Sequence, residues 1–276
     1  MRVVHSLVDA VRASDQLRSS GPVAMVPTMG ALHAGHVSLM QRAHALGARV
    51  VVSIFVNPLQ FGDATDLAKY PSDVARDIDI CREANVDLVW APSVHDMYPA
   101  GFATRVSVDG VSEPFEGRHR PGHFEGVATV VTKLFAVIRP DVAVFGAKDF
   151  QQVAVVKRLT ADLGLPVDID VAPTVRDHDG LALSSRNVRL DPEARARASV
   201  IPRSLVAAEK AWHSGVRNSR DIEAIVVGEL IDIDIDYASV VDPSTLAPRN
   251  DDSGPAVVLI AATVGGVRLI DNVVLT

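Results

Sequence analysis

The chain of 276 residues has little cysteine and no excess of positive charge. Its one cysteine, Cys81, cannot form an internal disulfide, which excludes a disulfide-stabilised secreted domain and fits a reducing cytoplasm. Acidic residues outnumber basic ones by 34 to 27, for a net charge of −7. Proteins that bind nucleic acid over a broad surface usually carry a basic excess, so we expect no nucleic-acid partner.

The chain also lacks a long apolar run. No window reaches the roughly 18 consecutive apolar residues that span a bilayer. The N-terminal stretch, which places Val4, Leu7, Val8 and Val11 at helical spacing, has no continuous apolar core and is no signal peptide. We therefore expect a cytoplasmic protein without a membrane partner. The hydrophobic fraction of 48% suffices for a sizeable core.

What the chain does contain is a series of short runs rich in valine and isoleucine. Their lack of polar alternation is typical of strands buried on both faces of a parallel sheet. Amphipathic helical patterns, such as residues 127–138, lie between them, which predicts right-handed βαβ units. The runs are VAMV (23–26), VVVSIFV (50–56), DLVW (87–90), VAVF (142–145) and VDIDV (167–171).

The pattern changes after about residue 175. A helix is predicted to begin at Asp191 as N-cap with Pro192 in its first turn, and a second covers residues 219–230. Strand-like runs follow, and Gly265-Gly266 indicates a hairpin between the last two. The sequence thus predicts an α/β protein: a Rossmann-like, doubly wound parallel sheet over residues 1–175 and a smaller C-terminal α+β domain over residues 176–276.

Polar residues follow the predicted strands at their carboxyl ends. In an open parallel sheet, ligands bind beyond these ends, so we expect the side chains to gather at one edge. They are Pro27, Thr28, Met29, His33 and His36 after the first run, Asn57 and Gln60 after the second, Gly146, Lys148, Asp149 and Gln152 after the fourth, and Ser184, Ser185 and Arg186 further on.

His33 and His36 flank Gly35 at a predicted helix start. A glycine lets a ligand approach the backbone, and a helix N-terminus attracts anions, so the segment favours phosphate binding. A zinc site is the competing interpretation, but it requires further ligands and no second close histidine pair occurs. Two ordinary residues at a helix start are the third possibility.

The other candidates also have structural alternatives. Lys148 after a buried strand can reach a phosphate, whereas Asp149 is equally explained as a helix N-cap. Ser184 to Arg186 form a plausible phosphate clamp or a surface turn. Arg120 and His123 could contact an anionic substrate or close a loop.

Five segments taken together resemble the pantothenate synthetases (pantoate–β-alanine ligases) of the nucleotidylyltransferase superfamily. The His-x-Gly-His element alone indicates only the superfamily, but the other segments follow in the same order and the resemblance covers most of the chain. The segments are PTMGALHAGH (27–36), FVNPLQF (55–61), EGRHRPGHFEGVATVVTKLF (116–135), FGAKDFQQ (145–152) and DGLALSSRN (179–187).

The resemblance implies ATP-dependent condensation of pantoate with β-alanine, which yields pantothenate, AMP and diphosphate through a pantoyl adenylate. It implies Mg²⁺ with ATP, a homodimer, and a C-terminal domain that acts as a lid. No nucleophilic side chain is expected, because orientation and electrostatic stabilisation supply most of the catalysis. The metal ligands are not identified.

The resemblance also implies residue roles. His36, Lys148 and Arg186 act on the reacting phosphates. Gln60, Gln152, Asn57 and the backbone near Met29 hold pantoate. ATP is bound by Pro27, Thr28, Met29, His33, Gly35, His36, Gly146, Lys148, Asp149, Leu183, Ser184, Ser185 and Arg186.

Three positions depart from the usual family pattern: Ser72 replaces arginine, Ala147 replaces Glu or Gln, and Leu183 replaces methionine. Ser72 and Ala147 remove a charged or polar group, whereas Leu183 conserves volume. An adenylyltransferase that acts on another small acid is one alternative function. An ATP-binding protein without activity is another, and the changes at Ser72 and Ala147 would be its signs.

Overall fold

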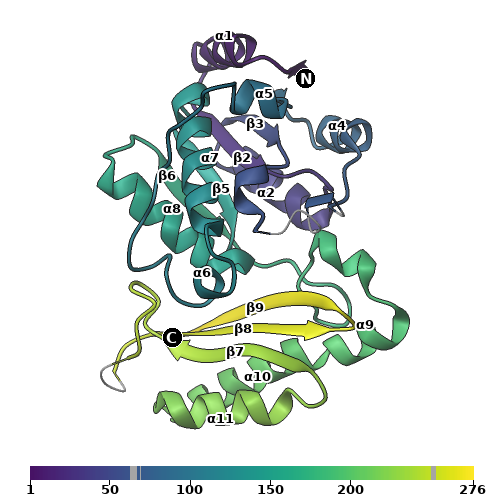
Figure 1. Cartoon of the computed structure of the whole chain (residues 1–276), viewed down its shortest axis with the longest axis vertical. Coiled ribbons are helices and arrows are strands. Elements are labelled where there is room, and N and C mark those ends of the chain that lie inside the picture. Colours follow the sequence, from purple (N-terminus) through teal and green to yellow (C-terminus); the bar gives the residue numbers. More distant parts are fainter. Residues whose placement is uncertain (63–66, 69, 250–252) are drawn as a thin grey trace. The chain divides into compact units, whose positions relative to one another are not determined.

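A computed structural model describes residues 1–62, 67–68, 70–249 and 253–276, so Lys69 of the KYPSD stretch lies outside the described residues. The chain divides into two compact units (Figure 1). One comprises residues 1–147 and 151–173, and the other comprises residues 148–150 and 174–276. Lys148 and Asp149, which the sequence placed in a domain of residues 1–175, are thus grouped with the second unit.

The first unit is built on a six-stranded sheet with the order β1-β4-β3-β2-β5-β6, in which every described pair is parallel. From β2 the chain proceeds outward to β3 and β4 and then returns to β5 on the other side of β2, which is the doubly wound arrangement predicted from the sequence. The strands are β1 (Arg2–Val4), β2 (Val23–Thr28), β3 (Arg49–Ile54), β4 (Leu88–Trp90), β5 (Val142–Gly146) and β6 (Asp168–Ala172).

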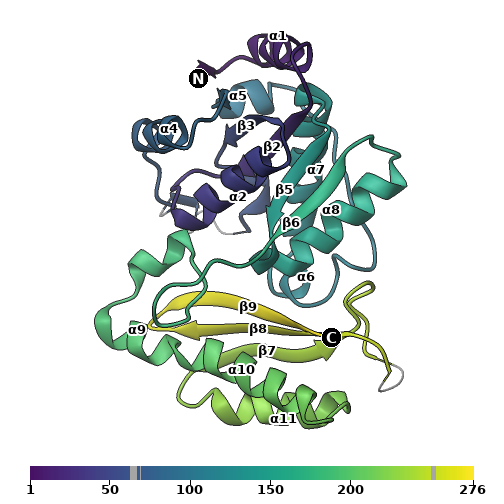
Figure 2. The same cartoon turned by 180° about the vertical axis from the view of Figure 1, so that it is seen from behind.

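Helices cover both faces of this sheet (Figures 1 and 2). The first unit contains α1 (Leu7–Arg18), α2 (Ala34–Ala45), α4 (Val74–Glu83), α5 (Val94–Met97), α6 (Glu116–His119), α7 (His123–Ile138), the 3₁₀ turn η1 (Pro58–Gln60) and all of α8 (Phe150–Asp162) except Phe150. The 3₁₀ turn η2 (Ala147–Asp149) begins in the first unit, and its last two residues are grouped with the second. The predicted start of the first helix is wrong, because Val4 lies in β1 and α1 begins only at Leu7. Ser6 is the N-cap of α1, and its side chain accepts from the Asp9 N–H.

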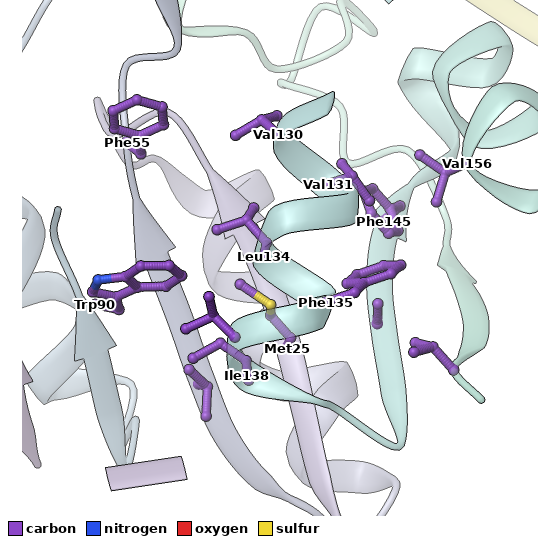
Figure 3. Close-up of a cluster of buried hydrophobic side chains, with 14 of the residues drawn as sticks. Met25, Phe55, Trp90, Val130, Val131, Leu134, Phe135, Ile138, Phe145 and Val156 are labelled. Carbon is purple, nitrogen blue, oxygen red and sulfur yellow. The ribbon is translucent and has the colours of Figure 1, made fainter. Parts of the chain in front are cut away.

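Alternate residues of each strand enter different cores. Met25 packs with residues of α1, α7 and α8 on one face, whereas Val26 packs with residues of α2 and α4 on the other. Figure 3 shows Leu134 and Ile138 on the side of α7 toward Trp90, and Phe135 on the side toward Phe145 of β5. Burial on both faces explains why the strands read as continuous apolar runs.

The second unit has its own core and an antiparallel sheet with the order β7-β8-β9. The predicted helix start is confirmed, because Asp191 caps α9 by accepting from the Ala194 N–H at 2.7 Å. The predicted hairpin is confirmed as well, since Gly265 and Gly266 both have positive φ, at 56° and 72°. The elements are η3 (Ser185–Arg189), α9 (Pro192–Ala198), α10 (Val200–His213), α11 (Ser219–Glu229), β7 (Asp234–Val241), β8 (Ala256–Val264) and β9 (Val267–Leu275).

None of the helices in the described ranges has the length and apolar character needed to cross a membrane.

Candidate active site

The two histidines form a reciprocal cap at the start of α2, which follows the central strand β2. Nδ1 of His33 accepts from the Gly35 N–H at 3.1 Å, and Nδ1 of His36 accepts from the His33 N–H at 3.3 Å. A capping box is usually built from Ser or Thr with Glu or Gln, and here two imidazoles perform both parts. The histidines therefore cap the start of α2, and their predicted contact with ATP stays a prediction.

This capping also decides which ring nitrogen carries the proton. Because each Nδ1 accepts from a backbone N–H, the neutral rings of His33 and His36 carry their hydrogen on Nε2. An Nε2–H donates to an anion but offers no lone pair to a metal. The ring centroids are 4.1 Å apart, at the N-terminal end of the helix dipole. The geometry therefore favours an anion site over a zinc site.

The loop that leads from β2 to His33 is held by a buried carboxylate. Asp77 of α4, which is 1% exposed, accepts from the N–H groups of Ala31 at 2.9 Å and Leu32 at 2.8 Å. Ala31 has a positive φ of 50°, and a Cβ on Gly30 would lie 2.8 Å from Asp77 Oδ2. Asp77 was not among the residues predicted from the sequence. The one indication of Asp77 in the sequence is that an acidic residue falls on the apolar face of a predicted helix.

Gln60 lies in η1, close to the same loop. Its Nε2 lies 3.0 Å from the Met29 sulfur, and its Oε1 accepts from Asn57 Nδ2 at 3.0 Å. Asn57 is 1% exposed and also bonds Leu59 N–H, the Tyr98 hydroxyl and the Gly126 carbonyl. The amide of Asn57 thus orients Gln60, and the pantoate contact predicted for Asn57 stays a prediction.

Arg120 and His123 approach Gln60 from the start of α7. His123 Nδ1 donates to the Gln60 carbonyl at 2.9 Å, because a carbonyl only accepts, and Arg120 Nη1 lies 3.2 Å from His123 Nε2. Arg120 Nη2 reaches the same carbonyl at 3.3 Å, and the half-buried guanidinium lies 3.6 Å from the Glu116 carboxylate. Both residues therefore close the loop around Gln60 and bring a cation beside it.

Gln151, the residue before the predicted Gln152, supports the loop before α6. Gln151, which is 5% exposed, donates to the carbonyls of Val111 and Pro114 and accepts from the Glu116 N–H at 3.0 Å. The sequence pattern singled out Gln152 and not Gln151, since neither residue type nor spacing distinguishes the two. Gln152 is half-buried in the first turn of α8, and its predicted position opposite Gln60 stays a prediction.

Lys148 is the second residue of η2, and this turn follows Gly146, the last residue of β5. Its side chain is 18% exposed, and its Nζ lies 3.8 Å from an oxygen of Asp149. The backbone carbonyl of Lys148 accepts from Asn272 Nδ2 of β9 at 2.8 Å. The lysine is thus fixed at its backbone by the C-terminal strand.

Ser184 to Arg186 begin η3, where Ser184 Oγ accepts from the Arg186 N–H at 3.3 Å. The preceding loop is clamped by Arg195, whose guanidinium contacts Asp179 at 2.6 and 3.0 Å and Asp177 at 2.7 Å. The hydrogen bonds from Arg195 hold the pKa of Asp179 below its ordinary value. Ser184 to Arg186 therefore follow an anchored loop and not an unconstrained surface turn.

A doubly wound sheet with a helix N-terminus directly after its central strand is typical of α/β proteins that bind nucleotides. The chain belongs to the pantoate–β-alanine ligase family, whose model matches residues 2–274.

Individual relatives agree along the whole chain. A pantothenate synthetase from Rhizorhabdus wittichii is 50% identical and covers 99% of this chain and 98% of its own length. The crystal structure of pantothenate synthetase from Thermus thermophilus is 45% identical, with a TM-score of 0.94 over 99% of both chains. A pantoate–β-alanine ligase from Francisella tularensis, complexed with β,γ-ATP and β-alanine, is 33% identical, with a TM-score of 0.83 over 99% of this chain and 97% of that one.

Proposed function

We propose that this chain condenses pantoate with β-alanine in an ATP-dependent reaction that forms pantothenate, AMP and diphosphate through a pantoyl adenylate. The match of the family model over residues 2–274 is the observation that carries this proposal. The ligands of the Francisella relative, β,γ-ATP and β-alanine, correspond to two of the three substrates that the reaction requires.

In the first step, a carboxylate oxygen of pantoate attacks the α-phosphorus of ATP, and diphosphate leaves. Both reactants are anions, so the site must supply positive charge and hydrogen-bond donors. His36 and His33 provide Nε2–H groups at a helix start, and Lys148 and Arg186 provide cations for the triphosphate. The remaining ATP contacts fall on Pro27, Thr28, Met29, Gly35, Gly146, Asp149, Leu183, Ser184 and Ser185.

Gln60 orients pantoate, together with Gln152 and the backbone near Met29. A carboxamide both donates and accepts, which suits a substrate that carries hydroxyl groups and a carboxylate. Because Asn57 and His123 fix the side chain and the carbonyl of Gln60, little conformational entropy is lost when pantoate binds.

In the second step, the amine of β-alanine attacks the acyl carbon of the adenylate, and AMP leaves with the electron pair of the broken acyl–oxygen bond. The ammonium group of β-alanine must first release a proton to water, because only the neutral amine has a lone pair, and the nitrogen releases a second proton to water as the amide forms. The contact with β-alanine predicted for Arg120 and His123 falls on the Arg120 guanidinium, because both ring nitrogens of His123 are bonded, one to the Gln60 carbonyl and one to Arg120. No covalent intermediate with a side chain is required.

We propose that Mg²⁺ enters with ATP, as part of the substrate. Within the described ranges, no group of three or more His, Cys, Asp or Glu side chains could hold a metal ion. In ATP-dependent enzymes Mg²⁺ commonly keeps phosphate oxygens and water as ligands, with few carboxylates, so a dedicated protein cage is not needed.

The test uses ATP, Mg²⁺, pantoate and isotope-labelled β-alanine with the purified chain. Labelled pantothenate and an equal amount of AMP are expected. If the chain releases ADP, or if label enters no product, the proposal is wrong. Exchange of labelled diphosphate into ATP with other small acids, but not with pantoate, would instead favour an adenylyltransferase. ATP binding without any product would favour a non-catalytic protein.

The family resemblance and the single cysteine further support a homodimer that works in the cytoplasm. Light scattering should then give a mass in solution of twice the 29.4 kDa of one chain.

A further inference from the structure

We propose that Asp271 and Asn272 of β9 are a positioning pair that ties both predicted phosphate-binding segments, at Lys148 and at Ser184 to Arg186, to one strand. This inference rests on the phosphate roles proposed above for those segments. Neither Asp271 nor Asn272 was singled out by the sequence, and neither is placed in contact with a substrate. All the contacts that carry the proposal lie within the second unit.

The first member of the pair anchors the loop before Ser184. Asp271, which is 3% exposed, accepts from both terminal nitrogens of Arg176, at 2.6 and 3.0 Å. Arg176 also donates to the Gly180 carbonyl at 3.0 Å and pairs with Ala182 in an isolated antiparallel bridge. A bidentate contact fixes orientation as well as distance. The base of the loop is therefore aligned from β9.

The second member anchors the lysine segment. Asn272 is 6% exposed, and its Nδ2 donates to the Lys148 carbonyl at 2.8 Å. Its own N–H donates to Asp271 Oδ1, also at 2.8 Å. The two anchors are thus consecutive residues joined by a hydrogen bond, so movement of one is transmitted to the other.

The strand that carries the pair is held in place by regular pairing with β8. Asp271 and Asn272 lie opposite Ile260 and Leu259 in an unbroken antiparallel register with β8, and both of these partners are buried. The hydrogen bond from Asn272 ties the backbone of Lys148 to β9. Both segments are therefore anchored to the same strand. A triphosphate held by Lys148 and Arg186 requires a constant distance between these two residues.

The main test is Asn272→Ala in the full chain, combined with Lys148→Ala in a double-mutant cycle. Loss of the anchor should lower kcat/KM for ATP by about 10-fold or more, since small misplacements of positioning groups are costly. Pantoate and β-alanine KM values should change less than twofold. Because Asn272 acts through Lys148, adding Asn272→Ala to Lys148→Ala should cause little further loss.

A matched control is Asn218→Ala, which removes another asparagine of the second unit, one that caps α11 by accepting from the Arg220 N–H. It should lower stability without changing kcat/KM for ATP. Hydrogen exchange supplies a readout that does not depend on activity. The backbone amides of residues 147–151 should exchange faster in Asn272→Ala than in the wild-type chain, and at the wild-type rate in Asn218→Ala.

If the wild-type chain forms pantothenate, two results would overturn the proposal about Asp271 and Asn272. One is unchanged exchange of residues 147–151 in Asn272→Ala. The other is a loss in kcat/KM that is equally large in the presence and absence of the Lys148 side chain. If the wild-type chain itself makes no pantothenate, the proposed function fails instead, and the exchange experiment still tests the anchor.

Discussion

Lys148 is the residue on which the proposed electrostatics depend most. Replacement by alanine should lower turnover by at least about 100-fold, the scale expected for loss of one donor at developing charge. Lys157→Ala is the control, because Lys157 is exposed on α8. Steady-state kinetics of AMP release measures both variants. Near-normal turnover of Lys148→Ala would remove the lysine from its role.

Asp77 supports the histidine loop without touching a substrate. In Asp77→Asn, one of the two N–H groups of Ala31 and Leu32 would face an amide donor instead of an oxygen. An unsatisfied buried group costs about 1–3 kcal/mol, so the free energy of unfolding should fall by that amount. The KM for ATP should rise, because His33 and His36 follow this loop.

Asp79→Asn, on the exposed side of the same helix, is the control for Asp77→Asn and should change neither quantity. Denaturant titration and ATP kinetics measure both variants. Equal behaviour of the two would contradict the loop-holding role of Asp77.

Cys81 predicts a pH dependence of stability. Burial, and then the charge of Asp77, raises the pKa of this thiol to about 12, whereas an unfolded thiol titrates near about 8.5. Between these values the unfolded chain has released the proton and the folded chain has not, so the unfolded state binds fewer protons. Stability from this group is therefore complete below about pH 8.5 and declines as pH rises.

Denaturant titrations from about pH 7 to about pH 10.5, a range that brackets the unfolded thiol pKa, measure the decline, and Cys81→Ala provides the comparison. The wild-type chain should lose more stability across this range than Cys81→Ala. Parallel curves would show that the thiol does not contribute. Because the folded thiol stays protonated, its alkylation should also be much slower in the native chain than in denaturant.

At the scale of elements, the contact between α7 and η1 shapes the surroundings of Gln60. A Cβ on Gly126 would lie 2.4 Å from the backbone of Leu59. Gly126→Ala must therefore push α7 away from η1, at a cost of about 1–3 kcal/mol, the range for overpacking. We expect lower stability and a higher KM for pantoate.

Gly228→Ala is the same substitution in open space. Gly228 lies in α11, and a Cβ at this position would have no atom within 4 Å. Gly228 lies in the last turn of α11, so alanine should raise stability by up to about 0.5 kcal/mol, the lower end of the range for replacing a helical glycine. Thermal unfolding measures both variants. Effects of the same sign would contradict the packing described for α7.

The elements were largely predictable because their signals are local. Apolar runs, Asp191 with Pro192, and Gly265 with Gly266 each specify structure within a few residues. The strand β1 was missed because three residues carry too little pattern and Val4 happened to match the spacing of the next helix. The edge position of β1 beside β4 is fixed by pairing with residues more than 80 positions away.

The candidate site divides in the same way. The histidine motif and Lys148 follow strands, so their general location could be derived from topology. Asp77, Gln151, Asp271 and Asn272 could not, because a buried polar side chain is recognised only through the distant backbone groups it satisfies. Asn57 illustrates the limit: its position after β3 was predicted, but its four internal hydrogen bonds were not.

At the scale of the whole molecule, each unit has a separate hydrophobic core, so each can stay ordered by its own packing. The central claim is that this chain performs one two-step reaction, adenylation of pantoate followed by attack of β-alanine.

That claim is tested most directly with pantoate labelled with ¹⁸O in its carboxylate. Attack of a carboxylate oxygen on the α-phosphorus, followed by cleavage of the acyl–oxygen bond, transfers one labelled oxygen to AMP. Mass spectrometry of the products should therefore find AMP that carries one ¹⁸O for each pantothenate formed. Unlabelled AMP, or label in the inorganic product, would contradict the account.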